Sequence, residues 1–122
     1  RTWDMLNTYI RENINLEYNI RLINLDSWGN IYIPNEKTEP LLNIDKQNLS
    51  TSPDFTCLYG INTSNCNVSI FYDDNKRKGK RFDMELKHNM FMLFPSSNMY
   101  LIDNKQQSNL NFVQTITYRD LR

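Results

Sequence analysis

Phe91-Met-Leu-Phe-Pro-Ser-Ser-Asn-Met-Tyr100 is the stretch of this sequence that says most about the fold. An apolar run at 90–94 ends at Pro95, and a second apolar run follows at 99–102 after three small polar residues. Proline fixes φ and has no N–H for a sheet ladder, so it belongs in a corner between strands. We therefore predict a buried strand, a sharp corner at 95–98 and a second strand that faces the first.

Short apolar segments separated by turn residues continue on both sides of this corner. Residues 18–22 alternate with period two, and the alternation resumes at Trp28 after a turn at 25–27. Residues 34–53 are polar and bracketed by prolines, which fits either a long loop or an edge strand with loops around it. Further strands are predicted at 55–61, 66–72, 81–86 and 110–118. About eight short strands indicate a closed or double-sheet all-β domain.

One helix is predicted before the strands, within residues 1–15. Its apolar stripe at helical spacing consists of Trp3, Leu6, Tyr9 and Ile10. We expect this helix to pack on the outside of the β core at 18–118. A chain of 122 residues can bury one core, so the sequence predicts a single domain over 1–122. Because the chain begins at Arg1 without an initiator methionine, we expect it to be part of a longer protein.

The charges balance. Fourteen basic and fourteen acidic residues give a formal net charge of zero, so no overall basic field favours nucleic acid or an anionic membrane as partner. No apolar run reaches the roughly 20 residues of a membrane-spanning helix. We expect protein partners. The candidate contacts are the exposed loop at 73–81 and the irregular segment at 34–53, although turn chemistry alone explains the composition of the loop. The candidate contact residues of the loop are Lys76, Arg77, Lys78 and Lys80.

Residues suited to catalysis are few. His88 is the only histidine and lies in a predicted turn, which excludes any site that needs two imidazoles. Ser96 and Thr115 have no histidine partner in plausible reach, so a hydrolytic triad has no support. If residues 55–61 and 66–72 form a hairpin, Cys57 lies opposite Ile70 and cannot reach Cys66. We therefore expect free thiols in a reducing compartment.

Residues 27–118 resemble the 2-oxoglutarate/iron(II)-dependent oxygenases, and most closely the small prolyl-4-hydroxylase-like proteins of marine bacteriophages and bacteria. The segments that carry the resemblance are Ser27-Trp-Gly-Asn-Ile-Tyr32, Cys57-Leu-Tyr-Gly-Ile-Asn62, Val68-Ser-Ile-Phe-Tyr72, Leu93-Phe-Pro-Ser96 and Asn111-Phe-Val-Gln-Thr-Ile-Thr117. The resemblance implies a double-stranded β-helix, or jelly roll. It also implies a site at the corner that binds Fe(II) and 2-oxoglutarate through two histidines, one carboxylate and a basic clamp.

The residues of that site do not carry over. By the resemblance, Leu42 stands where the first histidine should be, and Ile44 or Asp45 falls near the second ligand. Tyr100 takes the place of the distal histidine, and Leu110 or a neighbouring asparagine takes that of the basic clamp. A leucine cannot bind a metal, and Asp45 with Tyr100 provides at most two oxygen ligands. We expect a pocket filled by Leu42, Tyr100 and Leu110, with no cofactor.

Three hypotheses follow for the function. The first is a non-catalytic structural or interaction module, a component of a phage or virus particle found in the virion or host cytoplasm, which contacts other particle subunits or itself. The second is a working dioxygenase that binds Fe(II) through Asp45 and Tyr100. The third is a jelly roll that binds a small ligand or sugar in the old pocket. It predicts an open polar cavity near Tyr100, and a sealed apolar centre would remove it.

Overall fold

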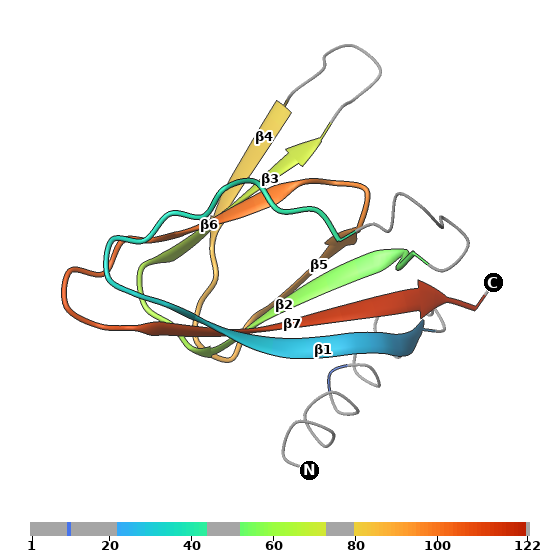
Figure 1. The fold of residues 1–122 in the computed structure, drawn as a ribbon, viewed down its shortest axis with the longest axis horizontal. Coiled ribbons are helices and arrows are strands. Elements are labelled where there is room, and N and C mark those ends of the chain that lie inside the picture. The colour runs from blue at the N-terminus through green and yellow to red at the C-terminus, as the bar shows by residue number, and fades with distance from the viewer. Residues whose placement is uncertain (1–9, 11–21, 44–51, 73–79, 122) are drawn as a thin grey trace.

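The fold is a mainly β structure of two antiparallel sheets that face each other (Figure 1). The computed structural model describes Ile10 and residues 22–43, 52–72 and 80–121. The strands of this part are β1 (Leu22–Tyr32), β2 (Phe55–Asn62), β3 (Cys66–Tyr72), β4 (Lys80–Glu85), β5 (Phe91–Pro95), β6 (Tyr100–Asn104) and β7 (Asn111–Asp120). No helix among these residues is long and apolar enough to cross a membrane.

Sheet A has the strand order β1-β7-β2-β5, and sheet B has the order β4-β3-β6. Residues 37–41 extend sheet B beyond β6 through isolated bridges at Lys37–Asp103 and Leu41–Tyr100. Backbone hydrogen bonds from Thr38 N to Ile102 O (2.9 Å) and from Leu41 N to Tyr100 O (2.7 Å) hold this segment in place. Of the two predictions for residues 34–53, the edge strand therefore describes 37–41, while 44–51 lie outside the described residues.

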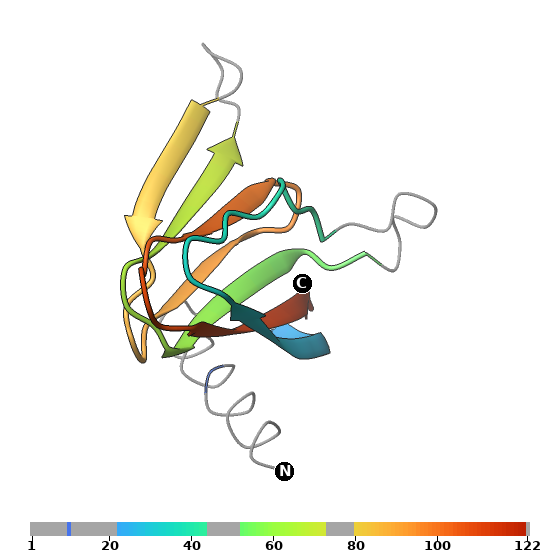
Figure 2. The same ribbon diagram turned by 60° about the vertical axis from the view of Figure 1, so that its left-hand side comes forward.

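The central core lies between the sheets and follows from the period-two alternation of the strands. Sheet A contributes Leu58, Met92, Phe94 and Val113, and sheet B contributes Cys66, Val68, Ile70, Tyr100 and Ile102. The predicted corner at Pro95 is confirmed, because β5 lies in sheet A and β6 in sheet B (Figure 2). Across this corner the rings of Phe94 and Tyr100 meet edge to face, with centroids 5.3 Å apart.

A second, outer cluster covers the opposite face of sheet A. It consists of Ile10, Leu22, Cys57, Ile116 and Tyr118. Ile10 is fully buried there and is the one described residue of the predicted helix at 1–15, which otherwise lies outside the described residues. Because β7 is packed on both faces, its side chains from Val113 to Tyr118 are all buried. The side chains of such a strand are buried whether they point toward the central core or toward the outer cluster.

Two sequence predictions about strand pairing are wrong. Residues 25–27 do not form a turn: β1 runs through them, with a bulge between Asn24 and Asp26 that restores its register with β7. β2 and β3 do not form a hairpin either, because β2 pairs with β5 and β7 while β3 pairs with β4 and β6. Period-two alternation identifies both strands but leaves their partners open.

The two cysteines are consequently separated by the sheets. Cys57 lies in the outer cluster and Cys66 in the central core, and both are free and buried. Burial raises the pKa of both thiols, that of Cys66 to about 12.

Asparagine provides the left-handed residues of three turns. Asn35 has φ 61°, Asn65 has φ 50° and Asn89 has φ 60°. Asparagine tolerates this region better than other residues with a Cβ because its short side chain bonds locally. Asn65 lies in the connection that carries the chain from sheet A to sheet B, and Asn89 lies in the one that carries it back.

Candidate functional site

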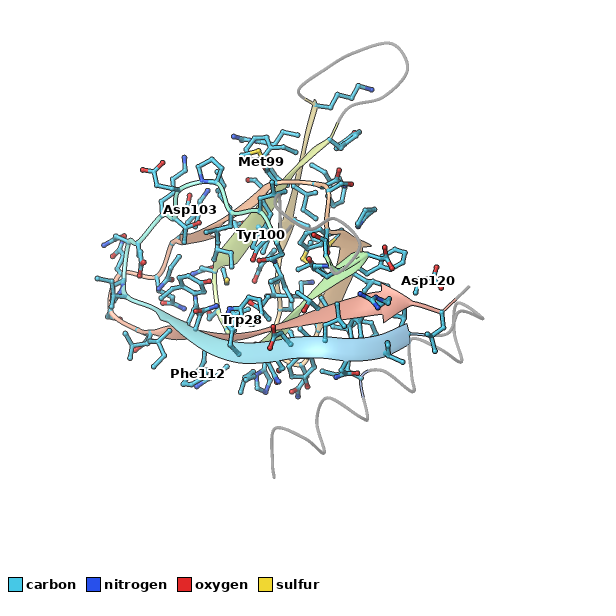
Figure 3. All side chains as sticks on the ribbon, turned by 45° about the vertical axis from the view of Figure 1, so that its right-hand side comes forward. Trp28, Met99, Tyr100, Asp103, Phe112 and Asp120 are labelled. Atoms are coloured by element: carbon cyan, nitrogen blue, oxygen red, sulfur yellow. The ribbon has the colours of Figure 1, made fainter. Side chains whose placement is uncertain are left out.

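Tyr100 opens β6 and is the centre of the candidate site. Its side chain is 3% exposed and points into the central core, between the two sheets (Figure 3). Two backbone hydrogen bonds join it to Leu41, at 2.7 and 3.0 Å. Leu41 is also the leucine that packs against the central core. The sequence prediction that Leu42 fills this place is therefore displaced by one residue.

Polar side chains surround the Tyr100 hydroxyl. We call Asn43, Thr56, Ser96, Tyr100 and Thr115 the hydroxyl cluster. Asn43 Nδ2 donates to Tyr100 Oη at 3.2 Å and to Thr56 Oγ1 at 3.4 Å. The Thr56 and Ser96 hydroxyls lie 2.8 Å apart and share a hydrogen bond in which either can donate. A side-chain hydrogen bond also joins Tyr100 to Thr115.

The hydroxyl cluster draws on both sheets and on the corner between them. Thr56 lies on β2 and Thr115 on β7, at positions whose side chains point toward the core. Ser96 immediately follows β5, and its N–H bonds to the Asp54 carbonyl at 3.0 Å. The corner at Pro95 thus places one hydroxyl in the interior, beside the pocket that the sequence predicted to be filled by Leu42, Tyr100 and Leu110.

Burial raises the pKa of the Tyr100 phenol, and the hydrogen bonds from Asn43 and Thr115 only partly oppose this effect. The phenol is therefore neutral at physiological pH. A phenol binds a metal as the phenolate, so iron binding here would have to release the proton that burial helps to retain. The cluster holds no acid, no imidazole and no cation that could serve as a general base or clamp a carboxylate.

The remaining predicted site residues lie apart from Tyr100. Leu110 is 54% exposed in the connection before β7, so the expectation that it fills the pocket is wrong. Leu110 directly follows a polar turn, where more than half of its surface stays exposed to solvent. Asp45, Lys76, Arg77 and Lys78 lie outside the described residues. Lys80 is half-buried at the start of β4, and the described residues contain no group of three His, Cys, Asp or Glu that could hold a metal.

Sequence reasoning named Ser96 and Thr115 only as lone hydroxyls without a histidine, and it missed Asn43 and Thr56. A signal was present in the alternation of β2 and β7, which sets Thr56 and Thr115 on the same face as Leu58 and Val113. A threonine on the apolar face of a strand needs a polar partner once buried. The alternation alone could not identify these partners, because Ser96 follows β5, Asn43 follows residues 37–41 and Tyr100 lies on β6.

Described residues line two surface hollows. One, of about 100 Å³, crosses the outer face of sheet B and is lined by Lys37, Asn67, Ser69, Arg81, Asp83, Leu101, Asp103 and Lys105. In it the Ser69 hydroxyl donates to Asp83 Oδ1 at 2.6 Å, and this bond together with Arg81 holds the pKa of Asp83 below its usual range. The other hollow, of about 520 Å³, is open and shallow between Asp54, Phe55, Pro95 and Asp120.

Comparison with known proteins gave no match: no family model fits the chain, and neither the curated proteins nor the solved structures contain a match to it. The resemblance to the oxygenases thus stays a prediction from the sequence segments alone.

Proposed function

We propose that this chain is a non-catalytic jelly-roll domain that acts as a structural or interaction module. The strand order supports the jelly roll. Counting residues 37–41 as a strand, four strands in the order β1-β7-β2-β5 face four in the order 37–41, β6, β3, β4. Apart from β3 and β4, which are neighbours in sheet B, successive strands alternate between the two sheets, as is typical of two Greek keys wound together.

The observation that carries the proposal is the environment of Tyr100. In the position where the resemblance expects the distal histidine, the chain buries a neutral phenol, which accepts from Asn43 and bonds to Thr115. These bonds use the hydrogen-bonding capacity of the hydroxyl within the protein. The same position in a working oxygenase must leave an electron pair for iron. The domain therefore contributes shape and surface, and its balanced charge favours protein partners, other particle subunits among them.

Iron loading tests the proposal. We expect the anaerobically Fe(II)-loaded protein to retain less than stoichiometric iron after desalting and to show no 2-oxoglutarate turnover. Tyr100→Phe is the matched variant because it removes the phenol oxygen that would bind the metal and keeps the ring packed against Phe94. Stoichiometric iron in the wild type that is lost in Tyr100→Phe, together with turnover, would establish the dioxygenase hypothesis and overturn ours.

A second candidate function is binding of a small polar ligand, and the hydroxyl cluster favours it. A sealed apolar centre would remove this hypothesis. The side chains that bond around Tyr100 are polar instead. Titration with simple sugars, followed by amide shifts in NMR spectra, separates the two functions. Saturable shifts around Thr56 and Thr115 that disappear in Thr115→Val establish ligand binding, whereas unchanged spectra leave the interaction module.

A further inference from the structure

β4 forms the outer edge of sheet B and is exposed along almost its whole length. From Arg81 to Glu85 every residue is exposed, and β3 is its one neighbour in the sheet order. Figures 1 and 2 show no described strand on its free side. An open sheet edge is a template for a further strand because its backbone N–H and C=O groups have no ladder partners.

The backbone groups on this free edge can be identified. Leu86 N donates to Cys66 O at 2.7 Å, which makes Leu86 and Cys66 a hydrogen-bonded pair in the β3–β4 register. Hydrogen-bonded and non-hydrogen-bonded pairs alternate along an antiparallel ladder. Phe82 and Met84 therefore bond to β3, whereas Arg81, Asp83 and Glu85 direct their N–H and C=O groups away from the sheet.

The side chains of β4 are sorted by face. Phe82 and Met84 lie opposite Ile70 and Val68 of the central core, yet they are 46% and 39% exposed. The other face carries Arg81 and Asp83, with side-chain exposures of 53% and 50% and a mutual N–O distance of 3.0 Å. One face thus presents uncovered apolar area, and the other presents both signs of charge in a short sequence.

We propose that β4 pairs with β4 of a second copy of this chain, antiparallel and centred on Phe82. Charge complementarity argues for this occupant. In this register Arg81 of each copy lies opposite Asp83 of the other, so opposite charges face each other at both positions, beside the ion pair that the two residues make within each chain. A register shifted to centre on Asp83 sets two carboxylates opposite each other, and one centred on Arg81 sets two guanidinium groups opposite each other.

The pairing also covers the apolar face. Phe82 meets its own copy in a non-hydrogen-bonded pair, where side chains approach most closely, and Met84 becomes its diagonal neighbour. Charged residues on an edge ordinarily discourage strand addition. Here their order makes the edge self-complementary, as a two-fold symmetric contact requires. Because the edge is short, the contact belongs to the small, weak class of interfaces. This inference rests on the proposed function and names its partner.

Charge reversal tests the pairing. We expect sedimentation of the wild-type chain to show a concentration-dependent dimer, and Arg81→Glu or Asp83→Arg alone to weaken it roughly tenfold or more, since each sets like charges opposite each other. Mixing the two single variants must restore association. In the mixed dimer the new carboxylate at position 81 faces the new guanidinium at position 83, and the unchanged Asp83 faces the unchanged Arg81. A common monomeric state of the wild type, the variants and the mixture overturns the proposal.

Disulfide capture tests the register. Phe82→Cys should cross-link to a covalent dimer under mild oxidation because the two residues meet on the symmetry axis. Asp83→Cys is the matched control in the shifted register and should cross-link far less. Cys57 and Cys66 are buried and stay out of the reaction. More cross-linking at position 83 than at 82 overturns the register. Neither experiment depends on iron, so the two proposals can fail separately. A monomeric chain without 2-oxoglutarate turnover would refute only the β4 pairing. A dimer with 2-oxoglutarate turnover would refute only the proposed function.

Discussion

In sheet A, β7 is packed on both faces, whereas in sheet B, β4 is exposed on both. The difference arises from what lies outside each sheet. The outer cluster around Ile10 covers the far side of sheet A, and sheet B meets the central core with one face only. We therefore expect an unequal division of stability, with more of it arising from the contacts of sheet A than from β4 of sheet B.

Truncation in the centre of sheet A should have the largest effect. Leu58 on β2 is fully buried in the central core. Leu58→Ala should lower the free energy of unfolding by about 3 kcal/mol through lost transfer energy and the cavity left behind. Met84→Ala on β4 is the matched change in sheet B and should cost less than about 1 kcal/mol. Urea denaturation measures both, and equal losses would contradict the division.

The polar contact between the sheets comes next. Asn104 on β6 is fully buried, donates to the carbonyls of Tyr32 (2.9 Å) and Ile33 (2.8 Å), and accepts from Asn111 Nδ2 at 2.7 Å. Asn104→Ala should cost about 2 kcal/mol because it leaves buried polar groups without partners. Asn67→Ala, on the outer face of β3, is the control in the same sheet and should cost within about 0.5 kcal/mol. An equal loss of unfolding free energy at both positions would contradict the role of Asn104 in linking the two sheets.

Alkaline pH should lower the free energy of unfolding by the smallest of these amounts. The pKa of Cys66 is raised from 9.0 to about 12, so the folded state keeps a proton that the unfolded state releases above pH 9. The stabilisation is complete below pH 9 and is lost as pH rises toward 12. At one unit above the unfolded pKa the loss is about 1 kcal/mol per thiol.

Unfolding under reducing conditions at rising pH measures this effect. Cys66→Ala should make the decline above pH 9 less steep, and a further Cys57→Ala, in the outer cluster, should reduce it again because burial also raises the pKa of that thiol. An unchanged slope in both variants would show that the thiols ionise in the folded state.

The sequence predicted the strands better than their partners. The apolar runs on either side of Pro95 identified the corner, because proline and alternation are local signals. The sheet assignment of β2 and β3 depends on contacts with β5, β6 and β7, which no local pattern contains. In the site, the resemblance implied a pocket position for Tyr100, and its side chain is buried in the central core. The hydroxyl cluster was not predicted, since Asn43 and Thr56 bond across segments that only the fold brings together.

The place of β7 in sheet A has a consequence for how the chain acquires its structure. β7 comes last among the described strands, yet it lies between β1 and β2, pairing with Leu22–Tyr32 on one side and Phe55–Asn62 on the other. Until β7 is made, β1 has no ladder partner in its sheet, and β2 has only β5. Contacts between segments so distant in sequence form late and slow the folding reaction. During synthesis, the backbone edges of β1 and β2 that pair with β7 therefore stay unpaired until β7 has been made.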